Sequence, residues 1–183
     1  MTESPRYTVI KKVGYIELRR YAGYIQAEVS VDGRDYRNAI EKGFNVLAGY
    51  IFGNNTAREK IAMTTPVKVN QSQKIAMTTP VTVRGSDRFT VAFVMPSELS
   101  METLPIPKDS SVQFNQFPEH TMATIRFSGY FRLNRIENNK QRLAQWLEEE
   151  GLSTEGEYIV AGYNPPWVPG FLARNEVLVK IKE

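Results

Sequence analysis

The chain of 183 residues has no cysteine and a single histidine, His120. The absence of cysteine excludes disulfides, thiolate metal sites and cysteine nucleophiles. One histidine cannot form a metal site built from several imidazoles or the HExxH helix of zinc proteases. The sequence also has no P-loop, no G-x-G-x-x-G and no G-x-S-x-G. The common nucleotide-binding and hydrolytic motifs are therefore excluded.

Long apolar runs are absent as well. No window approaches about eighteen apolar residues, and residues 1–6 lack the apolar stretch of a signal peptide. We therefore expect no membrane span, no secretion and a cytoplasmic location. The net charge is +3, but the basic residues are scattered in pairs, such as Arg19 with Arg20. This pattern is typical of a solvated surface, and we expect no nucleic-acid partner.

An eight-residue sequence, Lys-Ile-Ala-Met-Thr-Thr-Pro-Val, occurs twice, at 60–67 and 74–81. Its alternating apolar residues predict a strand in each copy. If the two strands pair, their apolar faces coincide only when the loop has an odd number of residues, for instance 70–72. The proline of each copy donates no hydrogen bond and predicts an interrupted ladder beside Met63 and Met77. This interruption fits either the wall of a pocket or a bulged hairpin in the core.

Periodicity divides the rest of the chain into strands and two amphipathic helices. The expected elements are a β-hairpin over 7–31, a helix over 34–52, a strand over 89–95, a hairpin of 111–117 with 121–127, a helix over 134–150, and strands over 158–163 and 176–181. The order is hairpin, helix, strands, and then the same again. It predicts one α+β domain with two related antiparallel sheets, in halves spanning about 7–96 and 111–183.

The polar residues offer little for catalysis. His120 stands in a Pro-Glu-His turn, where we expect an exposed side chain. Glu17, Glu28 and Glu176 alternate with apolar neighbours, and we expect outward-facing strand residues at these positions. No catalytic set is recognisable, so the residues predict a non-catalytic protein.

An apolar and aromatic set remains as candidate ligand contacts. Its members are Phe44, Leu47, Ala48 and Ile51 on the first predicted helix, Met63 and Met77 in the repeat, and Trp167 and Phe171 in a late loop. Such a set lines a core more often than a ligand pocket, and both alternatives stay open. Methionine thioethers can ligate haem iron, and an arginine such as Arg20 can pair with propionates.

The sequence resembles the SOUL haem-binding family over nearly its whole length. The repeated phrase matches the family motif Lys-Ile-Xaa-Met-Thr-Xaa-Pro-Val, of which this chain has two copies. Further segments resemble family signatures in the family's order: 15–21, 49–55, 93–96, and 161–166 with 174–177.

This resemblance implies a distorted antiparallel β-barrel of two βαββ-type halves, with two α-helices packed outside. It also implies haem or another tetrapyrrole in an apolar groove along the first helix. By position, the groove would use Glu41, Phe44, Ala48 and Gly49, with Met63 or Met77 nearby. Members thought to ligate iron through histidine carry it where this chain has Arg20. Haem binding here is then expected to be hydrophobic, with Met63, Met77 or His120 as a weak axial ligand at most.

Three functions follow from these observations. The first is a monomeric carrier or buffer that binds haem or another tetrapyrrole without chemistry on it. The second is a sensor of small amphipathic ligands, suggested by the resemblance to effector-binding domains of transcription regulators and by the apolar face of the first helix. The third is an enzyme acting on a tetrapyrrole or a small ester, for which the sequence offers no pair of nucleophile and base.

Overall fold

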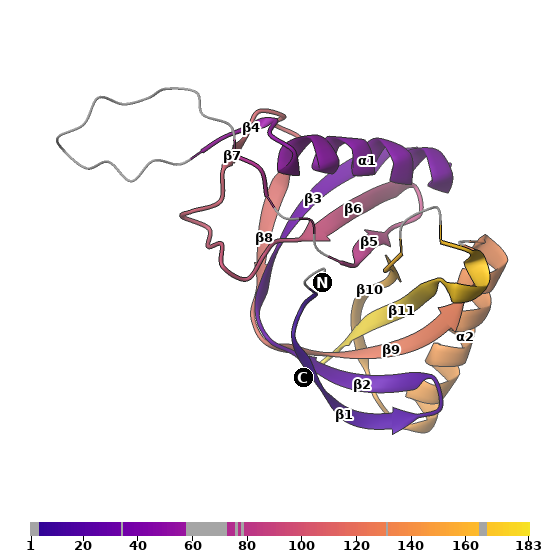
Figure 1. The fold of residues 1–183 in the computed structure, drawn as a ribbon. Helices are drawn as coiled ribbons and strands as arrows, with labels where there is room; N and C mark the ends of the chain where they lie inside the picture. The colour runs from indigo at the N-terminus through magenta and orange to yellow at the C-terminus, as the bar shows by residue number, and fades with distance from the viewer. Residues whose placement is uncertain are drawn as a thin grey trace, which may run out of the picture.

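The computed structural model describes residues 4–33, 35–57, 73–75, 77, 79–130, 132–164 and 168–183. These residues form two helices, α1 (Tyr36–Ile51) and α2 (Leu133–Glu149), outside a curled antiparallel sheet (Figure 1). The strands of the sheet are β1 (Tyr7–Val13), β2 (Ile16–Tyr21), β3 (Tyr24–Asp32), β5 (Val81–Arg84), β6 (Arg88–Val94), β8 (Gln113–Phe117), β9 (His120–Ser128), β10 (Thr154–Gly162) and β11 (Arg174–Ile181). Short elements complete the described part: β4 (Asn55–Thr56), β7 (Ile106–Pro107) and the 3-10 turn η1 (Gly170–Leu172).

Helix α1 begins at an aspartate cap. The Asp35 carboxylate accepts hydrogen bonds from the backbone N–H of Arg37 at 3.0 Å and of Asn38 at 3.2 Å. These bonds satisfy donors that the first turn of a helix leaves unpaired. The helix predicted over 34–52 is thereby confirmed. Its buried face packs on β3 and β6 and consists of Ala39, Gly43, Leu47, Tyr50 and Ile51.

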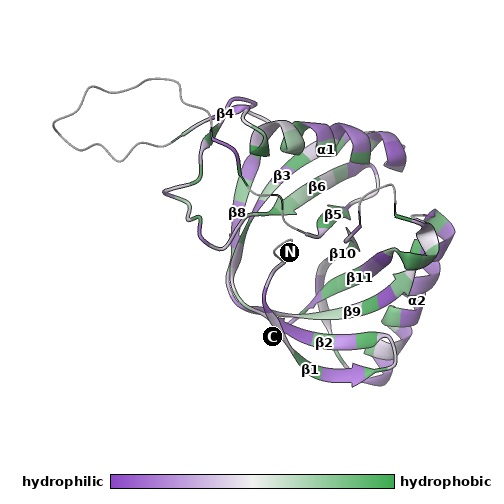
Figure 2. Ribbon diagram, in the orientation of Figure 1, coloured by the Kyte–Doolittle hydropathy of each residue, from purple (hydrophilic) through white to green (hydrophobic). Residues whose placement is uncertain are grey.

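Helix α2 confirms the helix predicted over 134–150. The four side chains expected to point inward are all buried: Ile136, Leu143, Trp146 and Leu147. They form a second apolar core with β9, β10 and β11, separate from the core beneath α1. Hydrophilic and hydrophobic residues alternate along both helices (Figure 2), so each helix covers its part of the sheet with one face and meets water with the other.

The strands run in the order β1-β2-β9-β11-β10-β5-β6-β3-β8 across the sheet. Two units of the same topology meet at its centre, where β5 pairs with β10. One unit is β3-α1-β5-β6 and the other is β9-α2-β10-β11, and in each the last strand lies between the other two. The predicted α+β fold of two βαββ-type halves with outer helices is confirmed. The predicted boundaries, 7–96 and 111–183, stay a prediction.

The predicted hairpins are wrong in their pairing. The range 7–31 holds three strands: β1 pairs with β2, but β3 lies in the other half and pairs with β6 and β8. Likewise β8 and β9 do not pair with each other, because β9 lies between β2 and β11. The two-residue connections at 22–23 and 118–119 resemble tight turns, but each carries the chain from one half of the sheet to the other.

The repeated phrase is only partly described. Its first copy, 60–67, lies outside the described residues, so the hairpin between the two copies stays a prediction. In the second copy the strand begins only at Val81. Ile75 is buried beneath α1, and its N–H donates to the carbonyl of Ile51 at 2.8 Å instead of to a neighbouring strand. At Ile75, therefore, the second copy is bonded to the end of α1 and not to a strand.

Candidate ligand-binding site

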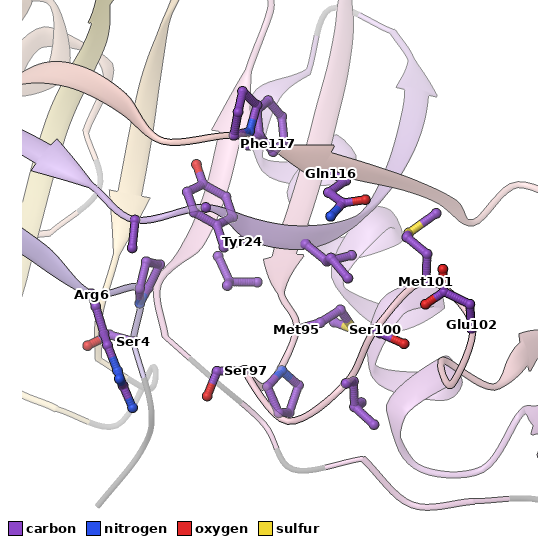
Figure 3. Close-up of a pocket in the computed structure, with 18 residues that line it drawn as sticks. Ser4, Arg6, Tyr24, Met95, Ser97, Ser100, Met101, Glu102, Gln116 and Phe117 are labelled. Carbon is purple, nitrogen blue, oxygen red and sulfur yellow. The ribbon is translucent and has the colours of Figure 1, made fainter.

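The two strand crossings touch each other and form one wall of a cavity. A Cβ atom on Gly23 would lie 3.0 Å from the carbonyl oxygen of Phe117, so the close approach favours glycine. Beside this contact lies a cavity of about 870 Å³ (Figure 3). The N-terminal segment 4–6, the end of β6 and the loop 96–102 supply its other walls. This volume falls within the range of about 300–1,000 Å³ that is usual for ligand sites.

The lining of this cavity, which we call the crossing cavity, combines polar and apolar surface in similar measure and includes two methionines. Met95 and Met101 come from the end of β6 and from the loop that follows it (Figure 3). Tyr24 and Phe117 pack with their ring centroids 5.3 Å apart. Burial raises the pKa of Tyr24 to about 12 although the charge of Arg84 opposes the rise, so its hydroxyl is neutral at pH 7. The cavity therefore offers aromatic and thioether contacts to an apolar ligand.

A smaller cavity of about 70 Å³ adjoins the crossing cavity and shares Tyr24 and Val94 with it. It continues toward β9, β10 and β11 and ends at Tyr163 and Arg174. A third cavity, described below, shares Arg174 with it. The inner face of the curled sheet thus carries a chain of adjoining cavities that runs from the first half to the second.

His120 is buried rather than exposed, which corrects the expectation from its turn sequence. Only 5% of its surface is exposed. The ring lies 5.9 Å from that of Tyr21, 5.6 Å from Tyr24 and 6.1 Å from Phe117 between centroids, and Nδ1 is 2.8 Å from the carbonyl oxygen of Pro118. Strand β9 begins at His120 itself, so the residue belongs to the sheet and is covered by the crossing.

Glu176 shows that the expectation of outward-facing glutamates is also wrong. It has no exposed surface, and its carboxylate accepts bonds from both arms of Arg19 at 2.8 and 2.9 Å. Arg174 donates to it at 2.8 Å and the hydroxyl of Tyr163 at 2.6 Å. Glu17 extends this network because it accepts from Arg19 at 2.8 Å.

Glu28 faces the same inner side of the sheet in the other half. Arg84 donates to its carboxylate at 3.2 Å, and the Asn115 amide donates at 2.5 Å. The side chain of Glu28 is 13% exposed. All three glutamates therefore point into the concave side of the sheet, whose other face is the one that packs against the helices.

The arginines keep the buried carboxylate ionised. Burial alone would raise the pKa of Glu176, but the hydrogen bonds and charge of Arg19, with Tyr163 and Arg174, hold it below its ordinary value of 4.5. Burial and the neighbouring Glu176 charge raise the pKa of Tyr163. Tyr163 therefore acts as a neutral hydrogen-bond donor in this network.

A sequence signal for this network was present. Glu17 with Arg19, and Arg174 with Glu176, are opposite charges two residues apart within strands. Residues at this spacing share one face of a strand, so paired charges there predict a polar cluster on that face. The spacing does not indicate whether this face is exposed to water or lies inside a curled sheet. For this reason the burial of the network could not be predicted from the sequence.

Comparison with known proteins places the chain in a family. The sequence matches the family model described as SOUL heme-binding protein over residues 2–180. The chain belongs to this family. Heme-binding protein 2 of Homo sapiens is 31% identical over 154 residues, covering 84% of this chain and 72% of the human protein. Heme-binding protein 1 of Xenopus laevis is 28% identical over 163 residues, covering 88% of this chain and 80% of that protein.

Solved structures share the fold of this SOUL-family chain. The C-terminal domain of EcmrR is similar with a TM-score of 0.61 and 13% identity, covering 97% of this chain and 98% of that domain. A hydrolase from Listeria innocua is similar with a TM-score of 0.59 and 11% identity, covering 91% of each chain. At such low identity the likeness concerns the fold alone.

The residues of α1 that were predicted for the site divide between core and surface. Leu47 and Ile51 are fully buried, and Phe44 is half-buried with its ring 5.4 Å from that of Phe93. Ala48 and Gly49 are half-buried. Glu41 is exposed. A ligand on this helix would therefore meet its half-exposed side, and Leu47 and Ile51 would support that side from beneath.

The other residues predicted for the site lie outside α1 in the sequence, and their place in one site stays a prediction. Arg20 lies on β2 in the second half, where it pairs with Glu119 at 3.1 Å and Glu183 at 3.6 Å. Met77 is 38% exposed and Phe171 is 77% exposed. Met63 and Trp167 lie outside the described residues.

No group of three or more histidine, aspartate or glutamate side chains is placed to hold a metal ion in the part of the chain that the structure describes. Within the same residues, neither helix has the length and apolar character needed to cross a membrane.

Proposed function

We propose that the chain binds haem or another tetrapyrrole in the crossing cavity and acts as a carrier or buffer. The observation that carries this proposal is a cavity of about 870 Å³ whose lining includes methionines and aromatic side chains, in a chain of the SOUL heme-binding protein family. The family description and the names of the relatives, Heme-binding protein 1 and 2, supply the ligand class.

The donor chemistry of the cavity fits haem. Met95 and Met101 offer thioethers, which are known haem-iron ligands. Haem bound there would bring an iron centre that accepts such soft ligands. Tyr24 and Phe117 would enclose the macrocycle, and the Arg6 guanidinium at the N-terminal wall would pair with a carboxylate.

The same lining supports binding without chemistry. Its titratable side chains are Arg6, Tyr24 and Glu102, and Tyr24 stays neutral because its pKa is raised to about 12. His120 does not line the cavity, and its Nδ1 is occupied by the Pro118 carbonyl. A carrier must enclose its ligand and hold the iron weakly, and methionine thioethers can supply that weak ligation.

The outer side of α1 is the competing location. The SOUL resemblance places the groove there, with Glu41, Phe44, Ala48, Gly49 and a methionine of the repeat. Gly49 tests this location well, because a Cβ atom there would meet nothing nearer than the Cβ of Asn54 at 4.0 Å. A larger side chain at Gly49 would block a ligand on the helix without disturbing the core.

The experiment is haemin titration followed by absorption on three proteins: the wild type, Met101→Glu and Gly49→Glu. Each variant introduces a glutamate at one location, Met101→Glu in the crossing cavity and Gly49→Glu on α1. Circular dichroism checks that both variants fold. We expect saturable one-to-one binding, an affinity at least tenfold lower in Met101→Glu, and no change in Gly49→Glu. The reverse pattern would move the ligand to α1. The absence of saturable binding by the wild type would overturn the function itself.

A second candidate function is a sensor of small amphipathic ligands. Methionine side chains adapt to ligands of different shape, and Met95 and Met101 line a cavity that continues into a smaller one. This function predicts that unrelated hydrophobic cations and aromatic compounds compete with haemin. If only tetrapyrroles bind, the sensor function is wrong and the carrier remains.

A further inference from the structure

We propose that the inner face of the second half holds a separate site for the phosphate or carboxylate group of a small molecule. The site is a cavity of about 250 Å³ that shares no lining residue with the crossing cavity. Its lining residues are Tyr7, Lys12, Gly14, Tyr15, Glu17, Arg19, Arg126 and Arg174. We refer to it as the cationic cavity.

The charges around the cationic cavity do not balance. Four positive side chains line it, and Glu17 is the one carboxylate among the lining residues. Glu176 lies behind the wall and adds a second negative charge through its bonds to Arg19 and Arg174. Two positive charges remain in excess within one small hollow. Such an excess attracts an anion from solution.

Glu176 cannot supply the missing counter-charge. Its two oxygens already accept from Arg19, Arg174 and Tyr163, and the carboxylate is fully buried. Arg126 stands directly opposite Glu176 in the pairing of β9 with β11. Nevertheless Arg126 makes no ion pair with any residue that the structure describes, and its side chain is exposed. The Arg126 guanidinium can therefore donate hydrogen bonds to a ligand.

The other cations are held in place before any ligand arrives. The Arg174 guanidinium lies 4.1 Å over the ring of Tyr163 and is fixed by Glu176. The Arg19 guanidinium lies 4.4 Å over the ring of Tyr7. Lys12 is tethered to Glu17 at 2.8 Å while its side chain stays 63% exposed. A fixed array of cations loses little entropy on binding, and planar guanidinium groups match phosphate and carboxylate oxygens.

The size of the cavity limits the ligand. A volume of about 250 Å³ corresponds to roughly eight water molecules of liquid. This is below the usual range for drug-sized ligands, so it excludes a whole macrocycle and admits a phosphate or a short carboxylate. The anionic group could belong to a free metabolite or to a lipid headgroup, which share this chemistry. The site therefore stands independently of the proposed haem function.

The test is a titration with inorganic phosphate followed by backbone amide NMR. We expect saturable shifts at residues 12, 17, 126 and 174 in the wild type and an affinity at least tenfold lower in Arg126→Ala. Arg142→Ala is the matched control, because Arg142 is exposed on α2 and does not line the cavity, and the variant loses the same charge. Equal affinity in Arg126→Ala and wild type, or shifts that never saturate, would overturn the site.

Two further experiments are needed. The first distinguishes a lipid headgroup from a free anion, and the second tests whether the cationic cavity and the haem site are independent. Sedimentation with phosphatidylcholine vesicles containing or lacking phosphatidic acid identifies a headgroup ligand if binding needs the anionic lipid and Arg126. Phosphate binding without vesicle binding identifies a free anion. Haemin titration of Arg126→Ala is expected to match the wild type. A loss of haemin affinity in this variant would overturn the separation of the cationic cavity from the haem site.

Discussion

Glu176 is a carboxylate without exposed surface, surrounded by Arg19, Arg174 and Tyr163. A buried ion pair contributes little net stability compared with apolar residues of the same shape, but removing one partner leaves the other charge buried and unpaired. Without Glu176, Arg19, whose side chain is only 3% exposed, would keep only Glu17 as a counter-ion. Glu176 thus has a structural task of its own, apart from any ligand.

Glu176→Gln is expected to lower the free energy of unfolding at pH 7 by up to about 3–5 kcal/mol, because the buried Arg19 charge then keeps only the partly exposed Glu17 as a counter-ion. Urea unfolding measures this change. Tyr163→Phe is the matched control: it removes one hydrogen bond to the carboxylate and should cost only about 1.5–3 kcal/mol. Equal stability of Glu176→Gln and the wild type would show that the network is not held by its charge.

The pH dependence follows from the same residue. The pKa of Glu176 lies below its ordinary value of 4.5, so the stabilisation by its charge is complete above about pH 4.5. It is lost as the pH falls through the lower pKa of the folded state. The difference between wild type and Glu176→Gln should therefore shrink below pH 4.5. Unfolding measured at a series of pH values checks this, and a difference that stays constant would contradict it.

At the scale of elements, α1 rests on the sheet through a close contact that only glycine permits. A Cβ atom on Gly43 would lie 2.5 Å from Cγ2 of Val91 on β6. Gly49 lies on the same helix, but a Cβ atom there would have open space. The two glycines therefore give opposite expectations for the same substitution.

Gly43→Ala is expected to destabilise the chain by about 1–3 kcal/mol, because the helix must move away from β6. Gly49→Ala should stabilise it by up to about 1 kcal/mol, since alanine favours helix and meets no neighbour. Thermal unfolding of both variants measures the two effects. If both substitutions stabilise the chain, α1 does not depend on the contact at Gly43.

The elements themselves were predictable from the sequence, whereas their partners were not. The 3.6-residue period placed α1 within two residues of its ends. Alternation placed β6, β8 and β9 nearly as well. Pairing failed because the residues of a strand do not encode which distant strand lies beside it. The crossing cavity was missed for the same reason, since its walls come from segments that meet only through that pairing.

At the scale of the molecule, each half of the sheet is completed by a strand from the other part of the chain. Strand β2 precedes β3 in sequence but pairs with β9, and β8 precedes β9 but pairs with β3. Each half therefore contains one strand that the chain places beside the other half in sequence. We expect this exchange to make the fold one cooperative unit.

The fragments 1–96 and 111–183, produced separately, are expected to be unfolded. The first lacks β8 beside β3, and in the second β9 lacks β2. The intact chain should unfold in one transition. Circular dichroism of each fragment, and of their mixture, measures this: the mixture should recover part of the sheet signal. A stable fold in either fragment alone would show that the halves are independent domains.

The exchanged strands also relate this fold to that of a shorter chain with a single ββαββ unit. A chain with a single ββαββ unit would leave its first strand without a partner in its own unit, and only a second copy could pair with it. The present topology is that of a domain-swapped homodimer whose two copies have been fused end to end. The connections at 22–23 and 118–119 are then its hinges. Loosening either hinge would free a strand for another molecule, so swapped oligomers of this chain would begin there.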